Sequence, residues 1–145
     1  MLNTTIVIDD SEADRYLARR TLKKAGVTHR VLEFPDALSA LGLLGDREAF
    51  AQQCGPWPPR AVVLLDINMP RMDGFEFLEA LDERIKAGDV LPGALAVVMY
   101  STSDFQSDVD RARSHGIVVD YVVKPITVEF AARIARIAES LDAVP

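Results

Sequence analysis

Cysteine, histidine and basic residues are scarce in this sequence of 145 residues. It contains one cysteine, Cys54, and two histidines, so an internal disulfide is impossible and a zinc site is not expected. Sixteen Lys and Arg residues stand against 22 Asp and Glu residues, which gives a net charge of −6. Because nucleic-acid binding depends on clustered basic residues, this balance argues against direct contact with a phosphate backbone.

Long apolar runs and phosphate-binding glycine loops are also missing. No apolar stretch reaches the roughly 20 residues of a membrane-spanning helix, and the N-terminal segment lacks the features of a signal peptide. We therefore expect a cytoplasmic protein that does not enter a membrane. Neither G-x-G-x-x-G nor G-x-x-x-x-G-K-S/T occurs, which disfavours the nucleotide-binding enzymes.

Five short apolar stretches alternate with five helical patterns. The stretches cover residues 4–8, 29–34, 61–65, 95–99 and 118–123. This alternation predicts an α/β domain with a parallel sheet. The first, third and fourth stretches are continuously apolar, as in strands buried on both faces, whereas polar residues interrupt the second and fifth. The order 2-1-3-4-5 of a flavodoxin-like, doubly wound (βα)5 fold places the interrupted strands at the edges of the sheet.

Polar residues precede the apolar stripes of the expected helices and are candidates for N-caps, because their side chains can accept hydrogen bonds from the first turn. The four candidates are Ser11, Asp36, Asp73 and Thr127. The buried stripe of the first helix is expected to include Leu17, and that of the second helix to include Leu38.

One segment, residues 45–60, departs from the alternating pattern. It is long for a connection in a compact domain, and it is expected to hold about one turn of helix around residues 48–53, followed by a proline-rich loop. Trp57 is expected to pack this loop onto the body of the domain. No other segment breaks the pattern, so we expect residues 1–145 to form a single domain with no output domain.

Polar side chains follow four of the expected strands. Because the carboxyl ends of parallel strands meet at one edge, we expect these side chains to gather there. Three carboxylates repel one another unless some are protonated or a cation lies among them, and oxygen ligands favour Mg²⁺. Three carboxylates, one Mg²⁺ and one lysine sum to zero charge, which leaves a site able to accept a phosphoryl group on Asp66. The residues are Asp9, Asp10, Asp66, Ser101, Thr102 and Lys124.

Four short motifs carry a resemblance that covers essentially the whole chain. They read IDD, LLDINMPRMDG, MYSTS and YVVKP, at residues 8–10, 64–74, 99–103 and 121–125. In this order, at the ends of four strands, they resemble the receiver domain of bacterial two-component response regulators, in particular the stand-alone, chemotaxis-like receivers. The resemblance implies that Asp66 is phosphorylated by a sensor histidine kinase or a histidine phosphotransfer protein.

The same resemblance implies a role for each of the remaining motif residues. Asp10 and Asp66 would bind Mg²⁺ directly, Asp9 would bind it through water, and Asn68 would bind it through its backbone carbonyl. The phosphoryl group would be contacted by the Ser101 hydroxyl, by the Thr102 backbone and by the Lys124 ammonium. Ser101 and Tyr121 would then form the switch, in which the tyrosine ring turns inward when the hydroxyl moves toward the phosphate.

The resemblance also implies partners and kinetics. The segment 45–60, the STS run at residues 101–103 and the Asp108-Val109 pair are similar to stand-alone receivers that serve phytochrome-type sensor kinases. The last strand and the helices on either side of it form the face that receivers use for homodimers or targets. We expect a phosphoacceptor with slow self-dephosphorylation, and not a turnover enzyme. Thr102 is larger than the residue that receivers often have at this position, and its size could slow the access of water to the acyl phosphate.

Two other functions fit parts of the pattern. A phosphohydrolase of the haloacid dehalogenase type also uses an aspartate at the end of a parallel strand, but it expects a second aspartate two residues later, where Asn68 stands. A pseudo-receiver would keep the fold as an interaction module and would have lost phosphorylation. The intact set of acidic, hydroxyl and lysine residues argues against this second alternative.

Overall fold

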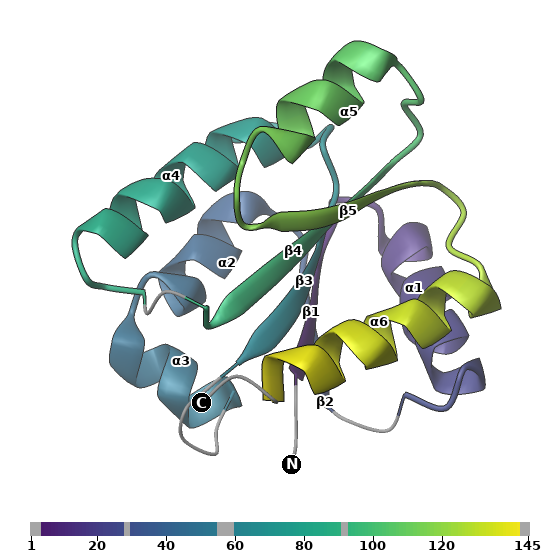
Figure 1. Ribbon diagram of the computed structural model, residues 1–145, viewed down its shortest axis with the longest axis horizontal. Coiled ribbons are helices and arrows are strands. Elements are labelled where there is room, and N and C mark those ends of the chain that lie inside the picture. Colours follow the sequence, from purple (N-terminus) through teal and green to yellow (C-terminus); the bar gives the residue numbers. More distant parts are fainter. Residues whose placement is uncertain (1–3, 28–29, 55–59, 91–92, 143–145) are drawn as a thin grey trace.

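A five-stranded parallel sheet, in the order β2-β1-β3-β4-β5, forms the centre of the computed structural model (Figure 1). The structure describes residues 4–27, 30–54, 60–90 and 93–142. The strands are β1 (Thr4–Ile8), β2 (Arg30–Phe34), β3 (Ala61–Leu65), β4 (Leu95–Ser101) and β5 (Val118–Val123). The predicted fold and strand order are thereby confirmed.

The edge and centre positions follow the polarity of the strands. Every residue of β1, β3 and β4 is buried, whereas β2 and β5 are partly exposed. The strand β4 is longer than expected, because it continues through Tyr100 to Ser101, and its pairing with β5 shifts register between Val97 and Val98.

Helices cover both faces of the sheet, as Figure 1 shows, with α1 and α6 on one face and the other helices on the opposite face. The helices are α1 (Glu12–Lys24), α2 (Ala37–Leu44), α3 (Arg47–Cys54), α4 (Gly74–Lys86), α5 (Gln106–Arg113) and α6 (Val128–Asp142). Alternate residues of a strand point to opposite faces, so Met99 joins the core under α2 to α5 and Tyr100 joins the core under α1 and α6.

The four predicted N-caps are present. The Ser11 hydroxyl accepts a hydrogen bond from the Asp14 backbone N–H at 3.2 Å, and Asp73 forms a capping box with Glu76. Asp36 and Thr127 cap α2 and α6 in the same way, through the backbone N–H groups of the residues three positions later.

Two residues predicted for buried stripes lie at the surface instead. Leu17 is 47% exposed and Leu38 is 48% exposed. In α1 the buried positions are Ala18 and Leu22, so the stripe is narrower than the sequence suggests. Leu17 borders a pocket at the carboxyl edge of the sheet, which Lys124 and Pro125 also line.

The irregular segment contains more helix than predicted. Helix α3 has eight residues, with the Asp46 carboxylate accepting hydrogen bonds from the first turn, and it buries Phe50 and Cys54 in the core. The prediction of one turn was wrong because these two apolar anchors are too few to give a clear stripe. Trp57 lies outside the described residues. No helix in the described ranges combines the length and hydropathy needed to cross a bilayer.

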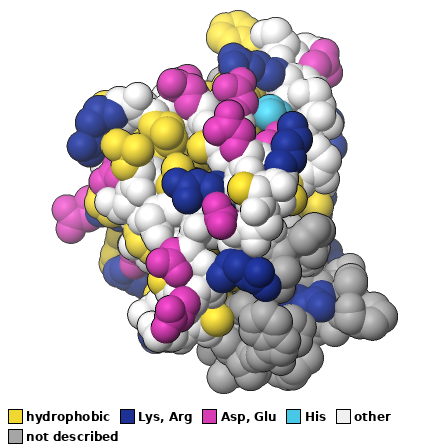
Figure 2. Space-filling view, turned by 90° about the vertical axis from the view of Figure 1, so that its left-hand side faces the viewer, with side chains coloured by type: hydrophobic (Ala, Val, Ile, Leu, Met, Phe, Trp, Pro, Cys, Tyr) yellow, Lys and Arg dark blue, Asp and Glu magenta, His cyan; other side chains and the backbone are white. Residues whose placement is uncertain are grey.

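Figure 2 shows the face on the side of α3 and α4. Basic and acidic side chains are interspersed on this face, and neither sign forms a continuous patch. Among the described residues of this face, the mixed pattern offers no basic track for a phosphate backbone.

Candidate functional site

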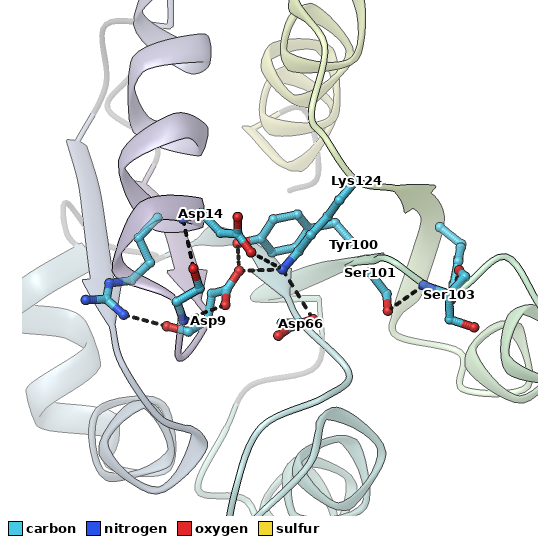
Figure 3. Close-up of polar contacts among 10 residues, drawn as sticks. Asp9, Asp14, Asp66, Tyr100, Ser101, Ser103 and Lys124 are labelled. Atoms are coloured by element: carbon cyan, nitrogen blue, oxygen red, sulfur yellow. Dashed lines mark hydrogen bonds and ion pairs between the residues drawn. The ribbon is translucent and has the colours of Figure 1, made fainter.

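The candidate site lies at the carboxyl edge of the sheet, where four strand ends meet (Figure 3). Asp9 follows β1, Asp66 follows β3, Ser101 ends β4 and Lys124 follows β5. Backbone hydrogen bonds continue the strand pairing into the site: the Asp66 N–H donates to the Ile8 carbonyl at 3.0 Å, and the Lys124 N–H donates to the Ser101 carbonyl at 2.8 Å. The sheet itself therefore holds the functional side chains in place.

Three carboxylates are gathered at this edge. Asp9, Asp10 and Asp66 each place a carboxylate oxygen within 4.8 Å of the other two. Asp9 and Asp66 are buried and Asp10 is exposed, so the cluster opens to solvent on one side. One Asp9 oxygen, Oδ1, accepts a hydrogen bond from the Ser11 backbone N–H at 2.9 Å. A set of hard oxygen donors with an open side suits Mg²⁺, which keeps several of its waters.

The Lys124 ammonium is surrounded by carboxylates. Its Nζ lies 2.7 Å from Asp9 Oδ2, 2.8 Å from Asp14 Oδ2 and 3.5 Å from Asp66 Oδ1. Burial alone would lower the pKa of Lys124, but the hydrogen bonds to Asp14 and Asp9 and the charge of Asp66 raise it above its ordinary value. The lysine is therefore charged at neutral pH and offsets part of the repulsion within the cluster.

Tyr100 forms the buried wall of the site. Its side chain is 2% exposed, and its hydroxyl donates to Asp9 Oδ2 at 2.6 Å. The Lys124 Nζ lies 4.7 Å from the centre of the tyrosine ring, within the range of a cation–π contact. Burial, followed by the hydrogen bond to Asp9, raises the pKa of Tyr100, so the phenol is neutral and acts as a donor.

Asp66 is a buried carboxylate whose pKa lies above its ordinary value. Burial raises its pKa to about 6; the neighbouring Lys124 opposes this shift and the charge of Asp9 adds to it. At neutral pH the carboxylate is ionised but poorly solvated. A buried, charged oxygen next to an ammonium is the arrangement expected of a nucleophile that attacks an electrophilic phosphorus.

The hydroxyl side of the site is held mainly by local contacts. Ser101 is fully buried, and its Oγ accepts a hydrogen bond from the Ser103 backbone N–H at 3.2 Å. The Tyr121 hydroxyl donates to the Ser103 carbonyl at 2.8 Å, and the Ser103 hydroxyl donates to Asp108 at 2.6 Å. Tyr121 is thus bonded to the loop that follows Ser101, and not to the acidic cluster.

Two predicted residues stand apart from these contacts. Thr102 and Asn68 are both exposed, and within the described part of the chain neither side chain forms a hydrogen bond to the carboxylate cluster. Thr102 lines a pocket of about 250 Å³ beside Lys124. Because their expected roles use backbone atoms, exposure of the side chains does not conflict with those roles.

Sequence reasoning missed Asp14 and Tyr100, which both touch the cluster. A signal for Asp14 was available, because it lies in the first turn of α1, a few residues after the acidic pair that follows β1. For Tyr100, the signal was a phenol inside a continuously buried strand, since such a hydroxyl needs a partner.

Comparison with known proteins gives the family. The sequence pattern described as the response regulator receiver domain matches residues 5–135. The chain belongs to the response regulator receiver family. The predicted resemblance is confirmed, and the chain is a phosphoacceptor of two-component signalling, a class that histidine kinases phosphorylate.

Three relatives match this receiver over most of its length. Protein PilH of Pseudomonas aeruginosa is 31% identical over 124 residues, which cover 86% of this chain and 87% of PilH. Response regulator Rcp1 of Synechocystis is 33% identical over 107 residues, 72% of this chain and 65% of Rcp1. The solved structure of the bacteriophytochrome response regulator AtBRR matches with a TM-score of 0.71 and 25% identity, over 96% of this receiver and 94% of that chain.

Proposed function

We propose that Asp66 is the phosphoacceptor of this receiver. The observation that carries the proposal is the buried Asp66 carboxylate at the end of a central strand, 3.5 Å from the Lys124 ammonium and within 4.8 Å of two further carboxylates. An Asp66 oxygen attacks the phosphorus of a phosphohistidine, the P–N bond breaks, and the histidine nitrogen leaves with the bonding electron pair. The product is an aspartyl phosphate.

The donor set fits Mg²⁺. Asp10 and Asp66 would bind the ion directly, and the Asn68 carbonyl would complete the protein ligands. Asp9 Oδ2 is already occupied by the Tyr100 hydroxyl and Lys124, which supports its predicted contact through water. When bound, the ion supplies positive charge to the phosphoryl oxygens. Lys124 supplies a second positive charge, and the Ser101 hydroxyl and the Thr102 backbone N–H supply donors.

The receiver acts as a switch and not as a turnover enzyme. A phosphohydrolase needs a group that protonates the leaving oxygen, and the exposed amide of Asn68 cannot do so. Phosphorylation draws the Ser101 hydroxyl toward the phosphate, which breaks its contact with the Ser103 N–H. Tyr121, bonded to the Ser103 carbonyl, turns inward with that loop.

The partners follow from this switch. The phosphodonor is a sensor histidine kinase, of the phytochrome type, or a histidine phosphotransfer protein; the AtBRR structure supports the first. The output face comprises α5, β5 and α6, where exposed Phe105, Val119 and Val128 offer apolar contacts for a homodimer or a target. Sedimentation with and without a phosphoryl analogue tests the dimer, and an unchanged assembly state would exclude it.

The test of the phosphoacceptor is intact mass after incubation with acetyl phosphate and Mg²⁺. One added phosphoryl group is expected, and it should be absent with EDTA and in the Asp66→Asn variant. If the variant gained the same mass, another residue would be the acceptor. If no adduct formed while phosphate was released steadily, the result would favour rapid turnover of the phosphorylated receiver or a phosphohydrolase. If neither an adduct nor free phosphate appeared, the result would favour a pseudo-receiver.

A further inference from the structure

A fourth carboxylate contacts the site from α1. Asp14 lies in the first turn of that helix, and its Oδ2 accepts a hydrogen bond from Lys124 Nζ at 2.8 Å. The distance from Lys124 Nζ to Asp9 Oδ2 is nearly the same, 2.7 Å. The distance from Lys124 Nζ to Asp66 Oδ1 is longer, 3.5 Å. Asp14 is not one of the three carboxylates that could hold an ion together.

The fourth carboxylate changes the charge balance of the site. Three carboxylates, Lys124 and a divalent ion sum to zero, and Asp14 brings the sum to −1. A phosphoryl group then adds further negative charge close to Lys124. An ammonium has three N–H donors, and Asp9 and Asp14 already occupy two of them. The incoming phosphoryl oxygens therefore meet a lysine whose charge is largely neutralised.

Asp14 can lose its contact with Lys124 more readily than Asp9 can. The Asp9 side chain is fully buried and accepts hydrogen bonds from Ser11, Tyr100 and Lys124. The Asp14 side chain is 36% exposed, and Lys124 is the one donor to its carboxylate among the described residues. Water can replace Lys124 at the partly exposed Asp14 carboxylate more readily than at the buried Asp9 carboxylate.

We propose that Asp14 competes with the phosphoryl group for the charge of Lys124 and so limits how stably Asp66 is phosphorylated. The inference rests on the proposed function of Asp66. Asp14 is a regulatory residue in this account: it acts through Lys124 and does not touch the reacting atoms. Phosphorylation of Asp66 weakens the contact between Asp14 and Lys124. The change at Asp66 therefore also alters the exposed face of α1 beside Leu17.

The test compares Asp14→Asn with Glu12→Gln. Both substitutions remove one negative charge from the first turn of α1 with little change in shape, but the exposed Glu12 makes no ion pair among the described residues. Affinity for beryllofluoride, an analogue of the phosphoryl group, is measured with Mg²⁺ at fixed ionic strength. We expect Asp14→Asn to bind about three- to tenfold more tightly than wild type, and Glu12→Gln to change by less than about twofold.

The outcomes separate this inference from the proposed function. If wild type binds beryllofluoride and Asp66→Asn does not, the acceptor site stands, and equal affinities for Asp14→Asn and Glu12→Gln would overturn the role of Asp14. If wild type does not bind the analogue, both proposals fail. The contact between Asp14 and Lys124 can also be tested without Mg²⁺ or analogue. The side-chain ¹⁵N NMR signal of Lys124 should shift in Asp14→Asn and should not shift in Glu12→Gln. An unshifted signal in Asp14→Asn would contradict the contact.

Discussion

The two sides of the site differ in how they are held. On one side, Asp9, Tyr100 and Lys124 come from three strand ends and share a buried network in which one carboxylate oxygen accepts two hydrogen bonds. On the other side, Ser101 and Tyr121 bond to the loop that follows β4, and the Tyr121 side chain is partly exposed. The first side is suited to hold charges in fixed positions, and the second side is suited to rearrange. Substitutions on the two sides should therefore have unequal effects.

The largest effect is expected on the buried side, from Lys124→Met. This change leaves Asp9 fully buried with one donor fewer and removes the positive charge that offsets three carboxylates. We expect the free energy of unfolding at pH 7.5 in EDTA to fall by about 2–4 kcal/mol, measured by urea denaturation. The control Lys86→Met removes an exposed lysine from the end of α4. Equal losses in the two variants would show that the network contributes little.

The opposite sign is expected for Asp66→Asn. Burial raises the pKa of Asp66 from its ordinary value of 3.8 to about 6, so the folded chain retains a proton there that the unfolded chain has already lost. Ionisation of Asp66 therefore costs stability: the cost is absent below pH 4, grows as the pH rises to 6, and is complete above that. Removing the charge should raise the free energy of unfolding by about 1–3 kcal/mol at pH 7.5.

The pH profile is the decisive readout for that variant. The gain from Asp66→Asn, measured in EDTA, should shrink to near zero at pH 4, where wild-type Asp66 is protonated. The control Asp104→Asn, an exposed carboxylate in the loop after β4, should show no such profile. A gain that stayed constant between pH 4 and pH 7.5 would mean that the charge of Asp66 is not its source.

Two tyrosines give a matched pair across the two sides. Tyr100→Phe removes one of the two donors to a buried Asp9 oxygen, and the expected loss is about 1–2 kcal/mol at neutral pH. The measurement is urea denaturation of Tyr100→Phe and Tyr121→Phe under identical conditions.

The smallest effect is expected from Tyr121→Phe. Its hydroxyl donates to a backbone carbonyl and its side chain is partly exposed, so water can replace the lost partner. The expected loss is about 0.5 kcal/mol. Should Tyr121→Phe cost as much as Tyr100→Phe, the proposed contrast between a fixed side and a mobile side would not hold.

Much of this architecture could be predicted from the sequence, because each strand has a clear signal. Continuous apolar runs marked β1, β3 and β4 as central, and a carboxylate or a lysine directly after a strand must lie at the carboxyl edge of a parallel sheet. That rule brings Asp9, Asp66 and Lys124 together without any knowledge of side-chain conformation. The N-caps were predictable for a similar reason, since they depend on local spacing.

The remaining features depend on packing between distant segments. The exposure of Leu17 depends on where the neighbouring elements end, and the burial of Phe50 in α3 depends on the room beside the sheet. The contact between Asp14 and Lys124 joins residues 110 positions apart. This contact depends on the length of the lysine side chain and on the angle of α1. The periodicity of the sequence specifies neither of them.

The most direct test of the account is to locate the phosphoryl group. An aspartyl phosphate is an acyl phosphate, so borohydride reduces it to homoserine, and fragmentation of the resulting peptides identifies the position. After incubation with acetyl phosphate and Mg²⁺, the account predicts homoserine at position 66 alone. Homoserine at position 9 or 10, and not at position 66, would contradict the assignment of the buried Asp66 as the acceptor.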